Sequence, residues 1–184
     1  MLAFFLKKLP QVIAYFAKSH YQKTKKYLTQ AQLYKYLAFL DYFAVKEMGR
    51  PVTGLRYIAL EQGPVPEELY QDIKKGYSYD ERFYKVLMTD KGVLIAPGEA
   101  TPDPDLLTEW EKAKINELIE IFAERWDENS HQEIKAWVKA FTRGVGTVID
   151  WKDEIEQIQD EHKRELFFER LETFNLMNSF PFRW

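Results

Sequence analysis

The sequence contains no cysteine, and only eight glycines and eight prolines occur among its 184 residues. The absence of cysteine excludes disulfide bonds, thiolate nucleophiles and zinc or iron–sulfur sites with cysteine ligands. It also fits a reducing compartment, and we expect a cytoplasmic protein. Because glycine and proline are scarce, the composition favours helices over a β-sandwich.

Long apolar runs are missing as well. The best candidate is the N-terminal stretch 1–17, which Lys7, Lys8 and Pro10 interrupt well before the roughly 20 apolar residues that a membrane span needs. Its positive charges follow the first apolar residues, whereas a signal peptide places them before its apolar run. We therefore expect a partly buried amphipathic helix here and no membrane partner.

The net charge is only −3, but it is unevenly distributed. Residues 1–52 hold nine Lys or Arg against two Asp or Glu, and the remaining residues hold 17 against 27. This division predicts a basic and an acidic face that could steer a charged partner, although solvated helix surfaces would produce the same pattern. The isoelectric point near 5.7 argues against a general nucleic-acid-binding protein.

Patterns typical of catalysis and metal binding are scarce too. His20, His131 and His162 never have the i, i+4 spacing of a helical metal-binding pair, and the sequence has no phosphate-binding loop or nucleophile elbow. We expect His131 and His162 to be solvated or to cap helix ends locally. The sequence predicts that the protein is not an enzyme and that it has no catalytic residues, metal or cofactor.

Large apolar side chains are abundant: 13 Phe, 11 Tyr and 5 Trp make up 16% of the chain. Apolar residues at helical spacing follow three capping-box patterns, in which Ser or Thr precedes Glu or Gln by three residues. These patterns are Thr29 with Gln32, Thr108 with Glu111, and Ser130 with Glu133. We also expect a first helix over about 10–17, a basic connector over 18–27 and a long last helix from about Asp153.

Two short segments have β character. Residues 56–60 predict a strand, and residues 83–88 and 93–95 predict a hairpin around the turn at 89–92. The helix that begins after Thr29 is apolar on nearly all faces and should lie at the centre. The predicted fold class is mainly α with a small β insert (α+β): a compact multi-helix domain with a short strand and a β-hairpin.

The most distinctive segment, residues 35–70, reads KYLAFLDYFAVKEMGRPVTGLRYIALEQGPVPEELY. An aromatic-rich helix stops at Gly-Arg-Pro, a turn and a short strand follow, and a Gly-Pro-Val corner leads into a second helix. Permissive glycines and φ-fixing prolines suit these places, so an architectural interpretation explains the motif. The motif residues, which we expect to be structural, are Gly49, Arg50, Pro51, Thr53, Gly54, Tyr57, Gly63, Pro64 and Val65.

This arrangement resembles the Panacea domain, the family of SocA-like and GepA-like antitoxin or phage-associated proteins. The resemblance covers residues 12–76 well and residues 107–150 more weakly. It implies a Panacea-like domain over residues 1–150 and a C-terminal helical extension, 151–184, packed on the same domain. It further implies the antitoxin of a toxin–antitoxin module, which neutralises a partner toxin, encoded by an adjacent gene, through direct protein–protein binding.

Other functions stay open at this point. The resemblance also implies an adaptor role, in which the protein delivers the toxin to a cytosolic protease. A third alternative is a nucleic-acid-binding regulator of its own operon, because lysines alternate with Tyr21 and Tyr27 and could contact phosphates while the rings stack on bases. The sequence leaves the oligomeric state open, a homo-oligomer included.

Residues that bind the partner are expected among aromatic and cationic side chains, because Trp, Tyr and Arg dominate interface energies. The C-terminal segment 180–184 is the strongest candidate, since chain ends tend to be exposed, although it could equally pack on the core. The candidate partner-binding residues are Lys23, Lys25, Lys26, Trp137, Arg143, Phe182, Arg183 and Trp184.

Overall fold

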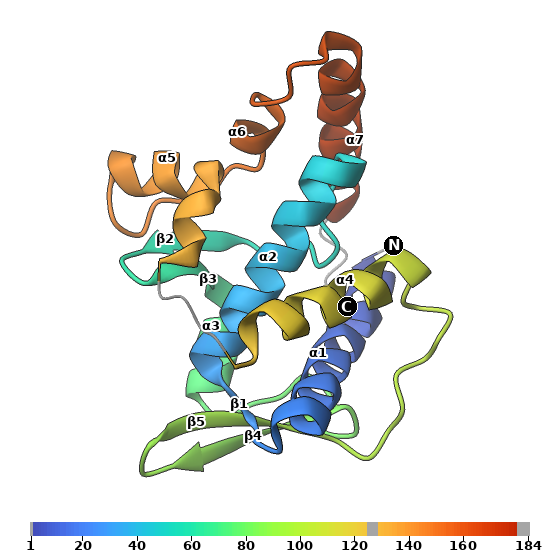
Figure 1. Ribbon diagram of the computed structural model, residues 1–184, viewed down its shortest axis with the longest axis vertical. Coiled ribbons are helices and arrows are strands. Elements are labelled where there is room, and N and C mark those ends of the chain that lie inside the picture. Colours follow the sequence, from blue (N-terminus) through green and yellow to red (C-terminus); the bar gives the residue numbers. More distant parts are fainter. Residues whose placement is uncertain (1, 125–128, 180–184) are drawn as a thin grey trace.

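The computed structural model describes residues 2–124 and 129–179 and is organised around one central helix, α2 (Gln30–Met48) (Figure 1). The other described helices are α1 (Leu2–Thr24), α3 (Glu67–Lys74), α4 (Glu109–Phe122), the 3-10 helix η1 (Ser130–Glu133), α5 (Lys135–Arg143), α6 (Lys152–Ile155) and α7 (Glu161–Ser179). The strands are β1 (Leu28–Thr29), β2 (Tyr57–Leu60), β3 (Gly63–Pro66), β4 (Tyr84–Thr89) and β5 (Gly92–Pro97). The predicted mainly-α class with a small β insert is confirmed.

Helix α2 forms as its sequence predicts. Thr29 and Gln32 make the reciprocal capping box, with N···O distances of 3.0 and 3.2 Å. Gly49 ends the helix in the left-handed conformation at φ +76°, and its N–H donates to the carbonyl of Val45 at 3.0 Å. Every residue from 33 to 42 is buried, because α4, α6, β3 and β5 cover different faces of the helix.

Helix α1 is longer than the sequence predicted. It does not end near residue 17 but continues to Thr24, so the expected basic connector is reduced to residues 25–27. The helix continues because His20 is buried on the same face as Phe16, one turn further along. Within the helix, Lys8 forms a buried 2.6 Å ion pair with Glu111, which ties α1 to α4.

The strands form two small antiparallel sheets. One has the order β1-β5-β4 and contains the predicted hairpin, which closes at the pair Thr89 and Gly92. The other pairs β2 with β3, although residues 63–66 were expected to form only a corner. A third segment extends this sheet, since the N–H of Ala59 donates to the carbonyl of Thr147 at 2.9 Å.

The C-terminal third differs from its prediction in two places. Ser130 does not cap a helix; η1 occupies residues 130–133, and the start of α5 is capped by Glu154, which accepts the N–H of Ala136 at 2.6 Å. The predicted long helix from Asp153 is divided into α6 and α7. Asp160 starts α7, because its carboxylate accepts the N–H of Lys163 at 2.9 Å.

Helix α7 extends along the C-terminal half of α2 (Figure 1). Its contact residues are Phe167, Leu171 and Phe174, which are all buried. Among the described residues, the helices are all too short or too polar to cross a membrane.

Candidate partner-binding surfaces

One buried carboxylate holds the motif segment that follows α2. Asp41 is fully buried, and its Oδ1 accepts the N–H groups of Val52 at 2.7 Å and Thr53 at 2.8 Å. Its Oδ2 accepts the hydroxyl of Tyr57 at 2.9 Å and that of Thr53. Burial raises the pKa of the Asp41 carboxyl, and these four hydrogen bonds oppose that rise. The hydroxyl groups of Thr53 and Tyr57 are therefore engaged in hydrogen bonds in the interior of the protein and are not exposed to a ligand.

Two glycines of the motif lie directly against α7. A Cβ on Gly49 would come within 2.9 Å of the Cα of Phe167, and one on Gly54 within 3.2 Å of the ring of Phe174. Both glycines have positive φ, +76° and +67°. The turn after α2 thus requires glycine both for its backbone conformation and for the close approach of α7.

The β2–β3 hairpin packs on an aromatic pair. His131 lies against Gly63 and meets the ring of Trp137 edge-on, with 4.4 Å between ring centroids. The indole N–H of Trp137 donates to the carbonyl of Leu60 at 3.2 Å. The expectation that His131 is solvated or a local cap is wrong, because this packing leaves it only 4% exposed. His162, by contrast, is exposed as expected.

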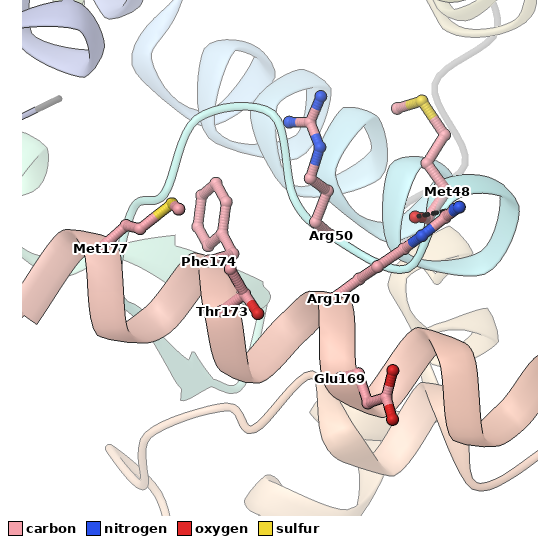
Figure 2. A pocket seen from close by; sticks show the side chains of 7 residues that line it. All are labelled: Met48, Arg50, Glu169, Arg170, Thr173, Phe174 and Met177. Carbon is pink, nitrogen blue, oxygen red and sulfur yellow. Dashed lines mark hydrogen bonds between the residues drawn. The ribbon is translucent and has the colours of Figure 1, made fainter.

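Two surface grooves lie beside the motif residues. A groove of about 630 Å³ runs between the end of α2 and α7 (Figure 2). This α2–α7 groove is lined by Met48, Arg50, Glu169, Arg170, Thr173, Phe174 and Met177. Its floor is mostly apolar, and it brings the motif residue Arg50 next to a helix that the sequence did not connect with it.

The second groove, of about 860 Å³, lies between the start of α2 and the β2–β3 hairpin. The motif residues Pro64 and Val65 line it together with Tyr34 and Tyr70, whose rings meet edge-on with centroids 6.3 Å apart. Its lining is more polar than that of the α2–α7 groove, because amide side chains and Glu61 contribute to it.

The predicted lysine cluster lies at the C-terminal end of α1. Lys23 forms an ion pair with Glu120 of α4, and the ammonium of Lys25 donates to the carbonyl of Gln22 at 3.0 Å. Lys26 is exposed. One of the three cations is therefore neutralised by a neighbouring helix.

Two of the remaining candidates, Trp137 and Arg143, lie on α5. Trp137 is buried, with 6% of its surface exposed, and it serves the packing of α5. Arg143 is exposed, and its Nη1 lies 3.9 Å from the carboxylate of Asp153, which also accepts the ammonium of Lys139 at 3.0 Å. Phe182, Arg183 and Trp184 lie outside the described residues.

The titratable groups of the core have structural partners. Burial raises the pKa of Glu154, which caps α5, and lowers the pKa of His20, whose Nδ1 lies 3.3 Å from the hydroxyl of Tyr36. In residues 2–124 and 129–179, no group of three or more His, Asp or Glu side chains is placed to hold a metal ion.

Sequence reasoning missed several residues that hold the motif segment or line the grooves. Asp41 could have been noticed, because it is the one charge between Tyr36 and Val45 on a helix that is apolar all round. Arg170 and Met177 carry no comparable signal. They belong to a helix without a clear apolar face, and only its packing on Gly49 makes them part of a groove.

Comparison with known protein families gives one match. The family described as "Antitoxin SocA-like, Panacea domain" matches residues 33–141, more than half of the chain. No curated protein and no solved structure matches significantly. The matched residues include most of α2, the whole motif and both hairpins, whereas α1, α6 and α7 lie outside them.

Proposed function

The chain belongs to the SocA-like antitoxin family that carries the Panacea domain, and we propose that it neutralises a partner toxin by binding it directly. The observation that supports direct binding is the contrast between the inside and the surface of the motif. Asp41, Thr53 and Tyr57 bond to one another in the core, while Arg50 reaches a mostly apolar groove on the surface. Apolar area with a cation beside it is typical of a protein interface.

A non-enzymatic mechanism is part of this proposal. The buried acids Asp41 and Glu154 accept backbone N–H groups, and His131 packs on Trp137. In these positions they stabilise the fold and are not presented to a substrate. The partner is expected to be a protein encoded by an adjacent gene, and the complex should form in the cytoplasm.

A growth experiment tests the function. Expression of the neighbouring open reading frame alone should arrest growth, and co-expression with this chain should restore it. If no neighbouring gene product is toxic, or if this chain rescues none of them, the proposal fails.

An adaptor role is the alternative that the family resemblance implies. It differs from direct neutralisation in a measurable way, because an adaptor shortens the half-life of the toxin and needs an active protease. The proposal of direct binding predicts that rescue persists in a strain that lacks the cytosolic proteases, with the toxin level unchanged.

A further inference from the structure

The α2–α7 groove combines two walls of different origin. Met48 and Arg50 belong to the segment that the family match covers, whereas Arg170, Phe174 and Met177 come from α7, beyond residue 141. In Figure 2 the ring of Phe174 rises from α7 beside the turn that carries Arg50, and Met177 follows one turn later. A groove of about 630 Å³ has room for a large apolar side chain.

The charges around this groove are not balanced. Arg50 is half-buried and makes no hydrogen bond or ion pair with any residue in 2–124 or 129–179. Arg170 donates to the carbonyl of Met48 at 3.2 Å, which leaves most of its N–H groups available. The single acid of the lining, Glu169, points away from Arg50 (Figure 2).

The half-buried Arg50 keeps its guanidinium N–H groups available to an acceptor from another molecule. Its planar N–H groups match a carboxylate, which can accept two parallel hydrogen bonds. The apolar floor beside it favours a bulky apolar side chain. The complement of this groove is therefore a peptide segment in which an acidic residue stands next to a large apolar one.

We propose that the α2–α7 groove receives such a segment of the partner toxin, with Arg50 binding its carboxylate and Phe174 and Met177 packing on its apolar side chain. This inference rests on the proposed antitoxin function. Because α7 lies outside the family match, its wall gives this chain a contact that the shared domain alone does not have. Arg50 supplies the anchor, and α7 supplies selectivity for one toxin.

Two substitutions in the full-length protein test the groove, with the toxin identified by growth rescue as the probe. Arg50→Glu should weaken binding of the toxin on the order of 10- to 100-fold, since it replaces attraction by repulsion at a buried contact. Met177→Ala should weaken binding about fivefold through lost packing. Titration calorimetry at two salt concentrations measures both changes, and the effect of Arg50→Glu should be smaller at high salt.

Matched controls separate the groove from general effects. Lys91→Glu makes the same charge reversal on the exposed β4–β5 turn, and Met88→Ala removes an exposed methionine from β4. Both should bind the toxin like the wild type. All four variants should unfold close to the wild-type temperature, because none of the four side chains is fully buried.

Three results would overturn the inference while leaving the proposed function intact. The first is wild-type affinity in Arg50→Glu. The second is a homo-oligomer of the free protein that Arg50→Glu dissociates, which would assign the groove to a second copy. The third is wild-type affinity in Met177→Ala, which would show that the α7 wall of the groove does not contact the toxin. Failure of the wild type to bind any neighbouring gene product would instead overturn the proposed function.

Discussion

The Asp41 carboxylate determines how the chain turns after α2. Two backbone N–H groups and two hydroxyls converge on it in a region that water does not reach. The net contribution of each of these hydrogen bonds to stability is small. Loss of the carboxylate would be costly, however, because its four donors would then stay buried without an acceptor. The motif residues Thr53 and Tyr57 consequently depend on one acid that lies outside the motif.

Replacement of Asp41 should therefore be severe. Asp41→Ala leaves buried donors of Val52, Thr53 and Tyr57 without an acceptor and should lower the free energy of unfolding by about 3–5 kcal/mol. Asp41→Asn keeps one acceptor oxygen and should cost about half as much. Urea denaturation measures both, and the exposed Asp105→Ala serves as the control, with no measurable change expected. Equal stability of Asp41→Ala and the wild type would contradict this role.

His20 gives the protein a defined sensitivity to acid. Burial lowers its pKa, so in the folded state the ring stays neutral below pH 6.5, where the unfolded chain takes up a proton. A depressed pKa means that the stability contributed by His20 is present above about pH 6.5 and is lost as the pH falls toward the folded-state pKa. The free energy of unfolding should thus decline between pH 7 and pH 5.

The His20→Gln variant tests this dependence, because glutamine does not titrate. Its free energy of unfolding should fall less between pH 7 and pH 5 than that of the wild type. The exposed His162→Gln should keep the wild-type slope. Identical slopes for His20→Gln and the wild type would show that another group carries the acid sensitivity.

At the scale of elements, the contact between the turn after α2 and helix α7 joins the family domain to the C-terminal region. Gly49 stands where a Cβ would overlap with both the side chain and the backbone of Phe167. No rotamer change relieves an overlap with backbone, so α7 or the turn would have to move. The α2–α7 groove would then change shape.

Gly49→Ala should accordingly destabilise the protein by about 3 kcal/mol or more, with one part from the positive φ and the larger part from the overlap. Gly146→Ala is the matched control, because Gly146 has φ +84° and open space around its missing Cβ. It should cost only about 1 kcal/mol. Thermal unfolding of both variants distinguishes strain from crowding, and equal losses would contradict the close packing of α7.

Elements with local signals could be predicted from the sequence, and elements that depend on distant partners could not. Local signals mark the ends of two helices. Capping boxes at Thr29 and Thr108 begin α2 and α4, and Gly49 ends α2. The pattern at Ser130 is also local but failed, since Glu154 caps α5 from 18 residues away. Strand β3 was not predicted because proline argues against a strand, and Pro64 and Pro66 are tolerated here only since β3 lies at the edge of its sheet.

The same distinction applies to the proposed binding surface, the α2–α7 groove. Arg50 could be identified as part of a motif, but its groove depends on the packing of α7, for which Arg170 and Met177 give no sequence signal. Trp137 was a candidate because indoles are frequent interface anchors, whereas the structure uses it against His131 and Leu60. Aromatic content alone therefore does not separate core residues from binding residues in this chain.

For the whole molecule, we propose a helical scaffold that covers a toxin and performs no chemistry on it. The motif segment follows α2 in the chain, and α7 completes one surface groove beside them (Figures 1 and 2). Sequestration of this kind is stoichiometric, so protection should depend on the ratio of the two proteins. A specific complex of this type is expected to bury roughly 1,200–2,000 Å² in total.

The most direct test is to co-express the chain with the toxic neighbouring protein in cells without cytosolic proteases and to determine the mass of the purified material by light scattering. Direct neutralisation predicts one particle that contains both proteins in a fixed ratio, together with normal growth. Normal growth with the two proteins eluting separately, or rescue that disappears with the proteases, would contradict it.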